Sequence, residues 1–205
     1  MILFLRKIAT GLIKLLYRVK IHNKENIPTD GALFVCNHLT MLDPIFILSG
    51  CSKDIYFLTK QEATKGLFGK MLVKAGAVPI DRANPSMESL IKCIKTLKEG
   101  HKLVLFPEGT RNKTGTTEIQ PIKEGAAIFA VKAKSKIVPI IIASKPKMFR
   151  KTHVLIGEPF ELSDYYGVKL TEEVTEKMNA DVKESLLKLQ ATIPSVITKQ
   201  KQIKG

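Results

Sequence analysis

The chain has 205 residues, 44% hydrophobic and 25% charged, which fits one folded domain and excludes a disordered or fibrous chain. The 33 Lys and Arg against 19 Asp and Glu give a net charge of +14, which favours nucleic acid, anionic lipid or phosphorylated substrates as partners. Cys36, Cys51 and Cys93 fit no metal-site spacing and no cleavable signal peptide is evident, so we expect reduced thiols.

Residues 1–19 (MILFLRKIATGLIKLLYRV) predict an amphipathic helix at the amino terminus. Its charges are all basic and too frequent for a spanning helix, which needs about 20 mostly apolar residues. Lys7, Gly11, Lys14 and Arg18 recur at helical spacing and form one narrow polar stripe beside a wide apolar face. This pattern favours a helix lying in a membrane interface, and the alternative is a helix packed on the domain's own core.

The rest of the chain alternates short apolar strands with helical segments. We predict strands at residues 17–22, 32–36, 55–59, 77–80, 102–106, 137–143 and 153–156, with 17–22 at a sheet edge. We predict helices at residues 44–49, 62–74, 86–98, 123–133 and 171–191, and a frayed basic tail at 198–205. The alternation predicts an α/β fold for residues 20–197, with a layered mixed, largely parallel sheet flanked by helices.

A histidine and an aspartate follow the buried strand ALFVC in the sequence Asn37-His38-Leu39-Thr40-Met41-Leu42-Asp43. An imidazole accepts a proton from an alcohol near neutral pH, and a carboxylate holds its second nitrogen in the required tautomer. The spacing alone is a weak signal. The alternative is that Asp43, which precedes Pro44, only caps a helix and that His38 is an ordinary loop residue.

Three further motifs lie at the ends of predicted strands or within them. Phe106-Pro107-Glu108-Gly109-Thr110-Arg111 combines a tight turn with a guanidinium that suits phosphate, although it also fits a surface turn with an ion pair. Gly76-Ala77-Val78-Pro79-Ile80-Asp81-Arg82 ends in an adjacent acid and base, and Val138-Pro139-Ile140 interrupts an apolar strand. A strand proline predicts an edge, a bulge or a pocket wall.

Taken together in this order, the four motifs resemble those of the glycerolipid acyltransferases, and among them the 1-acyl-sn-glycerol-3-phosphate acyltransferase family. The resemblance covers residues 37–140 and implies that His38 and Asp43 are catalytic. It implies that an acceptor phosphate is bound by residues of two motifs and by a lysine that follows a strand, namely Glu108, Gly109, Thr110, Arg111, Arg82 and Lys60. Thr40-Met41 departs mildly from a serine that many members carry in the first motif. The amino-terminal helix is similar to part of a two-helix membrane motif of some members.

The resemblance implies acyl transfer from acyl-CoA or acyl-ACP to the hydroxyl of lysophosphatidic acid, giving phosphatidic acid. His38 is then the general base, with no acyl-enzyme, because the chain has no Gly-x-Ser-x-Gly elbow. We expect no metal, no cofactor, and a peripheral location on the phospholipid surface at the cytoplasmic face of the cell membrane.

Three other functions stay open from the sequence. Glycerol 3-phosphate is a possible alternative acceptor. A nucleic-acid-binding domain explains the charge, but the chain has no Trp, 6% aromatics and no recognition motif, so we expect no nucleic-acid partner. A non-catalytic lipid-binding module leaves the Asn-His-x4-Asp motif unexplained.

Overall fold

The computed structural model describes residues 2–50, 55–74, 76–81, 87–114, 116–123, 125 and 127–202. Cys51 and Arg82 lie outside the described residues, so the predictions for them stay predictions. Cys36 and Cys93 are buried and form no disulfide with each other.

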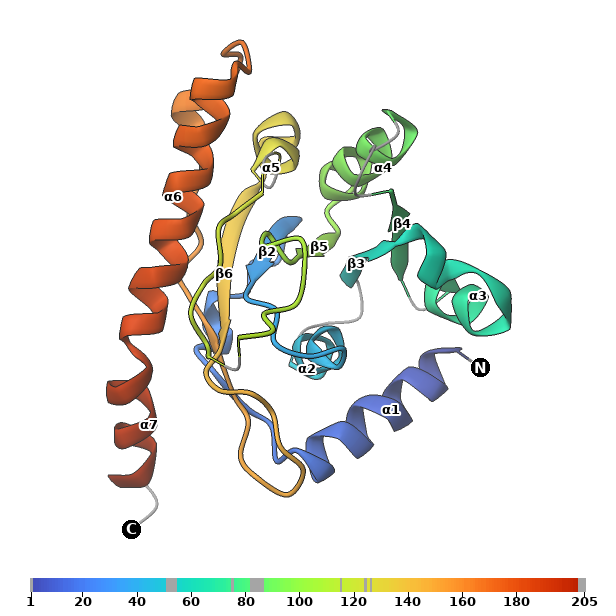
Figure 1. The fold of residues 1–205 in the computed structure, drawn as a ribbon, viewed down its shortest axis with the longest axis vertical. Helices are drawn as coiled ribbons and strands as arrows, with labels where there is room; N and C mark the ends of the chain where they lie inside the picture. Colours follow the sequence, from blue (N-terminus) through green and yellow to red (C-terminus); the bar gives the residue numbers. More distant parts are fainter. Residues whose placement is uncertain are drawn as a thin grey trace.

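Seven strands form one sheet in the order β1-β7-β6-β2-β5-β3-β4 (Figure 1). Their bounds are β1 Lys20–His22, β2 Ala32–Cys36, β3 Ile55–Lys60, β4 Ala77–Ile80, β5 Lys102–Leu105, β6 Lys136–Ile142 and β7 His153–Ile156. The paired strands are parallel except β6 and β7, which are antiparallel. The predicted mixed, largely parallel sheet is therefore confirmed, and β1 lies at an edge as expected.

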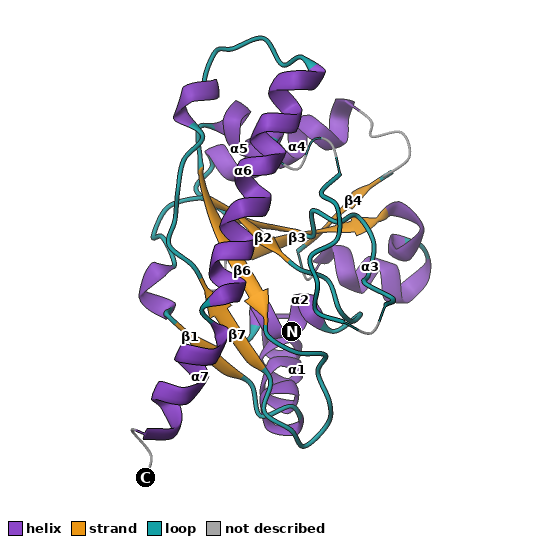
Figure 2. Ribbon diagram, turned by 60° about the vertical axis from the view of Figure 1, so that its left-hand side comes forward, coloured by secondary structure: helices purple, strands orange, loops and turns teal. Residues whose placement is uncertain are grey.

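Helices cover both faces of the sheet (Figures 1 and 2). Their bounds are α1 Ile2–Leu16, α2 Asp43–Leu48, α3 Gly66–Lys74, α4 Met87–Lys98, α5 Ile128–Ala133, α6 Glu172–Ala191 and α7 Ile193–Gln202. One core joins the sheet to α1, α2 and α3, and the other joins it to α4, α5 and α6. Because β2 is buried on both faces, its sequence ALFVC is a continuous apolar run and does not alternate.

The strands that carry the motifs lie side by side. Strand β5 pairs with β2 on one side and with β3 on the other, all parallel. The segments that follow Cys36, Leu105 and Lys60 therefore leave the sheet at the same edge. Neighbouring strands are about 4.8 Å apart, so the segments after β2 and β5 are adjacent and Lys60 lies one strand further away.

Two predicted helices differ from the observed ones. The segment 62–74 is split into a 3-10 turn, Gln61–Thr64, and α3. A Cβ on Gly69 would lie 2.0 Å from the backbone carbon of Thr64, so glycine permits this close contact. Helix α5 begins at Ile128 and not at Lys123, because the Lys123 N–H donates to Pro107 O at 2.9 Å and holds that segment against the preceding motif.

The carboxyl-terminal segment is more ordered than the sequence predicts. Residues 198–202, expected as frayed, belong to α7, which extends to Gln202. Ile193 and Val196 pack against the α6 side of the core. Their contacts supply the apolar burial that a short helix needs. The basic sequence of residues 198–205 alone does not predict this helix.

Pro139 lies within a central strand. Strand β6 lies between β7 and β2, so the edge explanation is wrong. On the β2 side Pro139 is paired with Val35. On the other side β7 has ended at Ile156, and the N–H of the next residue, Gly157, donates to Pro139 O at 2.8 Å. Pro139 also lines a cavity beneath α6, which confirms the pocket explanation.

Among the described side chains of helix α1, some pack on the core and others are exposed. Ile13 packs against the sheet together with Tyr17, which lies just beyond the helix. Ile8, Leu12 and Leu15 are 51%, 53% and 74% exposed on another side. Among the described residues, no helix combines the length and apolar character needed to cross a bilayer.

Candidate active site

His38 and Asp43 form a hydrogen-bonded pair beyond the end of β2. The distance between His38 Nδ1 and Asp43 Oδ2 is 2.8 Å. Asp43 is fully buried, and 12% of the His38 side chain is exposed. With the Nδ1 proton donated to the carboxylate, the tautomer leaves Nε2 with its lone pair. The predicted pairing of imidazole and carboxylate is therefore present, in the geometry that general-base chemistry requires.

Three groups besides the imidazole donate to the Asp43 carboxylate. The backbone N–H groups of Leu39 and Thr40 donate to Oδ2 at 2.6 and 2.8 Å. The Thr40 hydroxyl donates to Oδ1 at 2.7 Å, so Thr40 supplies a hydroxyl where many relatives were expected to have serine. Helix α2 begins at Asp43, but its side chain points back into this loop and does not cap the helix. The sequence alternative of a simple cap is therefore wrong.

Asn37 fixes the end of β2 to β6. Its side chain accepts from the Ile142 N–H at 2.8 Å and donates to Ile142 O at 3.1 Å. The Ala143 N–H is bonded to β7, so the neighbouring Ile142 points its backbone groups toward β2, which has already ended. The Asn37 amide therefore makes the hydrogen bonds to Ile142 that the backbone of a longer β2 would make. The sequence did not predict this role.

The segment after β5 holds the His38 backbone at both its polar groups. The His38 N–H donates to Glu108 Oε1 at 3.2 Å, and the Asn112 N–H donates to His38 O at 2.7 Å. The Phe106 ring stacks on the imidazole, with centroids 4.0 Å apart and planes 21° apart. The first two motifs therefore form one unit, although 70 residues separate His38 from Glu108.

Glu108 is 3% exposed, and one of its carboxyl oxygens, Oε2, is buried without a hydrogen-bond partner among the residues that the structure describes. Burial raises its pKa from 4.5 to about 7, against the lowering effect of backbone hydrogen bonds from His38 and Gln120. This placement makes Glu108 a support for the His38 loop. Direct contact between Glu108 and an acceptor phosphate stays a prediction.

Gly109 makes the turn that exposes the rest of this motif. Its φ is +68°, a left-handed conformation that glycine adopts without strain. A Cβ there would lie 2.6 Å from Lys123 Cδ, so the Lys123 stem crosses directly over Gly109. Thr110 and Arg111 are exposed, and within the described part of the chain Arg111 makes no ion pair. Lys123, which was not among the predicted site residues, adds a second cation beside the turn at Gly109.

Lys60 ends β3 at the same edge of the sheet. Its side chain is 64% exposed and lies 3.4 Å from a carboxyl oxygen of Glu62. Strand β4 ends beside it, with Lys60 paired to Ile80, so Asp81 follows at this edge as well. Lys60 is therefore on the predicted side of the sheet, one strand beyond the His38 and Arg111 segments.

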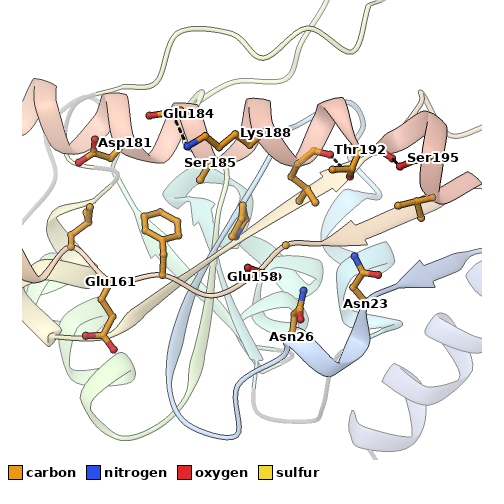
Figure 3. A pocket seen from close by; sticks show the side chains of 16 residues that line it. Asn23, Asn26, Glu158, Glu161, Asp181, Glu184, Ser185, Lys188, Thr192 and Ser195 are labelled. Carbon is orange, nitrogen blue, oxygen red and sulfur yellow. Dashed lines mark hydrogen bonds and ion pairs between the residues drawn. The ribbon is translucent and has the colours of Figure 1, made fainter.

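A cavity of about 740 Å³ lies elsewhere, lined by α6, α7, Pro139 of β6 and the segments that follow β1 and β7 (Figure 3). Its lining includes Pro139, the acidic residues Glu158, Glu161, Asp181 and Glu184, and Lys188. None of the predicted site residues lines it, so it is separate from the His38 site.

In the ranges that the structure describes, no three His, Cys, Asp or Glu side chains are grouped as metal ligands. The expectation that the reaction needs no metal or cofactor remains an expectation. The chemistry proposed for the His38 site uses only the side chains described above.

Comparison with known proteins bears on the class of enzyme. A family model described as Acyltransferase matches residues 18–143, a range that contains all four motifs. The chain belongs to the acyltransferase family. The range also includes the Asn37 amide and the Glu108 and Asn112 contacts that hold His38.

Individual relatives of this acyltransferase have related names. A Bacillus subtilis protein called 1-acyl-sn-glycerol-3-phosphate acyltransferase is 35% identical over 81% of this chain and 87% of its own length. A Helicobacter pylori protein of the same name is 30% identical over 80% of this chain and 73% of its own. The crystal structure of the Thermotoga maritima 1-acyl-sn-glycerophosphate acyltransferase PlsC superposes with a TM-score of 0.65 at 26% identity, covering 91% of this chain and 81% of that one.

Proposed function

We propose that this acyltransferase moves a fatty acyl group from a thioester donor to the free hydroxyl of 1-acyl-glycerol-3-phosphate. The product is phosphatidic acid, and the reaction belongs to phospholipid synthesis. The observation that carries the proposal is the His38–Asp43 pair, in which one hydrogen bond from Nδ1 to the carboxylate holds the imidazole ring. The names of the relatives support the choice of acceptor.

In the proposed reaction His38 acts first as base and then as acid. Nε2 takes the proton of the acceptor hydroxyl while its oxygen bonds to the thioester carbonyl carbon. As the tetrahedral intermediate collapses, the C–S bond breaks and the imidazolium returns the proton to the leaving thiolate. Asp43 stabilises the imidazolium and keeps the ring oriented. The proton is conserved, and no acyl-enzyme forms.

The acceptor phosphate is proposed to bind the cations near the turn at Gly109. Arg111 is exposed and suits bidentate phosphate recognition, and the Lys123 stem packs against the same turn. Holding the phosphate fixes the hydroxyl near His38, and positioning of this kind supplies up to about 7–11 kcal/mol in favourable cases. Lys60 lies farther along the same edge as a supporting cation, and Arg82 is kept as a sequence-based candidate.

The proposed location is the surface of an anionic membrane, where the lipid acceptor resides. Exposed apolar side chains on α1 beside basic residues support it. Either acyl-CoA or acyl carrier protein serves as donor in this proposal.

The test measures thiol release by purified protein from each donor, with lysophosphatidic acid or glycerol 3-phosphate as acceptor. We expect turnover with lysophosphatidic acid, and a fall in turnover of about 10²–10⁴-fold in His38→Ala and Asp43→Asn. The His38→Ala variant keeps the backbone bonds of residue 38, so it should remain folded. Near wild-type activity in the folded variant would exclude the mechanism, and preference for glycerol 3-phosphate would exclude the acceptor.

A further inference from the structure

The loop between β6 and β7 exposes two large apolar side chains at its tip. Met148 is 51% exposed and Phe149 is 68% exposed. Single exposed apolar residues are common on folded proteins. Adjacent ones at the tip of a long hairpin loop are less easily explained by packing, since neither belongs to a core cluster.

The loop is held in a strained conformation. Phe149 has φ +61°, in the left-handed region that costs a residue with a Cβ about 1–2 kcal/mol. The turn is closed by the Arg150 N–H donating to Lys147 O at 3.2 Å. This conformation presents an aromatic ring to solvent, so the local strain is not offset by burial of the ring.

Three backbone hydrogen bonds fix the loop to the end of α1 and to the segment that leads from it into β1. The Phe149 N–H donates to Leu16 O at 2.6 Å, the Thr152 N–H to Tyr17 O at 3.1 Å, and the Lys20 N–H to Thr152 O at 2.8 Å. Both ribbon views place the loop beside the carboxyl-terminal end of α1 (Figures 1 and 2). Leu15, 74% exposed, immediately precedes the residue that accepts from Phe149.

The loop charges are all positive. Lys145, Lys147, Arg150 and Lys151 flank Met148 and Phe149, and no acidic residue occurs between 144 and 152. Apolar side chains surrounded by cations suit the interface of an anionic bilayer, where the rings enter the acyl boundary and the cations meet lipid phosphates. The cavity beneath α6 differs in charge, because four acidic side chains and one cation, Lys188, line it, and Lys188 is paired with Glu184 at 2.7 Å.

From these observations we infer that Met148 and Phe149 insert into the surface of an anionic bilayer together with the exposed side of α1. The inference rests on the membrane location in the proposed function and adds a second insertion point. Two insertion points joined by backbone hydrogen bonds fix the orientation of the molecule on the membrane more firmly than the helix alone.

The chain has no Trp, so a single introduced indole reports on its own surroundings. We expect the emission of Phe149→Trp and of Met148→Trp to shift to shorter wavelength on vesicles of phosphatidylcholine and phosphatidylglycerol, and to be quenched by brominated acyl chains. Met87 is 71% exposed on α4, at the far end of the molecule from the loop (Figure 1). Met87→Trp should show neither change.

Binding is tested with a second pair of variants. Met148→Ser with Phe149→Asn removes both apolar side chains, and Asn tolerates the left-handed backbone, so the fold should persist. Its affinity for the same vesicles should fall about tenfold or more, because two apolar side chains leave the interface. The matched control is Met87→Ser with Ile91→Ser, which removes two apolar side chains exposed on α4 and should bind like wild type.

Emission at positions 148 and 149 that stays unshifted while the protein pellets with vesicles would overturn the inference alone. Failure of every variant and of wild type to bind vesicles would overturn the inference together with the membrane location. Both readouts are independent of acyl transfer, so the activity proposal is tested separately.

Discussion

Glu108 carries a carboxyl group whose ionisation opposes folding. Burial raises its pKa from 4.5 to about 7 in the folded chain. Between about pH 4.5 and 7 the folded state therefore holds a proton that the unfolded state has released, so stability falls as pH rises through this window. The deficit persists above pH 7, where both states are ionised.

We predict that Glu108→Gln removes this pH dependence. The variant keeps an acceptor for the His38 N–H and has no ionisable group. The free energy of unfolding of the variant minus that of wild type should increase by about 1–3 kcal/mol from about pH 5 to pH 8. Urea denaturation at each pH measures this difference. A difference between the two proteins that stays constant across this range would contradict the raised pKa.

Arg111 is expected to act on the acceptor and not on the fold. Its side chain is exposed, so Arg111→Ala should change stability by less than about 0.5 kcal/mol. Loss of a charge-assisted contact to phosphate should raise the acceptor KM about 10–100-fold, with a small effect on the donor KM. Lys113→Ala, which removes another exposed cation of the same loop, is the control. An unchanged acceptor KM would exclude the phosphate role of Arg111.

At the residue scale, the sequence predicted the pairing of His38 with Asp43, because the two residues lie five positions apart within one loop. The contacts of Glu108 and Asn112 with the His38 backbone were not readable. They depend on β5 lying beside β2, and that strand order is set by packing across the whole sheet.

At the element scale, the two hydrogen bonds between the Asn37 side chain and the Ile142 backbone join the end of β2 to β6 and so position His38, the next residue. Asn37→Ala leaves the N–H and C=O of Ile142 buried and unpaired. We predict a loss of about 2–4 kcal/mol in the free energy of unfolding, since each unsatisfied group costs about 1–3 kcal/mol. Acyl transfer by the folded variant should also fall, because residue 38 follows directly. If urea denaturation gave Asn37→Ala the same stability as wild type, the stabilising role of the Asn37–Ile142 hydrogen bonds would be excluded.

Strands were easier to predict than helix ends. Strands β2, β4 and β7 match the predicted ranges because each is a short apolar run bounded by polar or turn residues. The start of α5 was missed because Lys123 forms a backbone bond to Pro107, a contact between distant segments. Helix α7 was missed because it is stabilised by Ile193 and Val196 packing on the core. The basic residues at its carboxyl-terminal end suggested a disordered tail instead.

On the scale of the whole molecule, the surplus positive charge is unevenly placed. Residues 145–151 carry four cations and no acid, whereas the α6 cavity is lined by one cation, Lys188, and by four acids, Glu158, Glu161, Asp181 and Glu184. An anionic surface attracts the first region and repels the second. The net charge of +14 was plain from the sequence, but this polarity required the fold, because the acidic residues come from separate segments.

This polarity predicts a salt-dependent membrane affinity. Raising ionic strength from about 0.05 M to about 0.5 M shortens the screening length to a few ångströms, so attraction of exposed cations to lipid phosphates is largely lost. We expect affinity for vesicles containing phosphatidylglycerol, measured by sedimentation, to fall about tenfold or more. The weaker affinity for pure phosphatidylcholine vesicles, which depends on apolar insertion by α1 and Phe149, should change less than about twofold. Salt-independent binding to anionic vesicles would mean that apolar insertion alone holds the enzyme and that its positive charge serves another purpose.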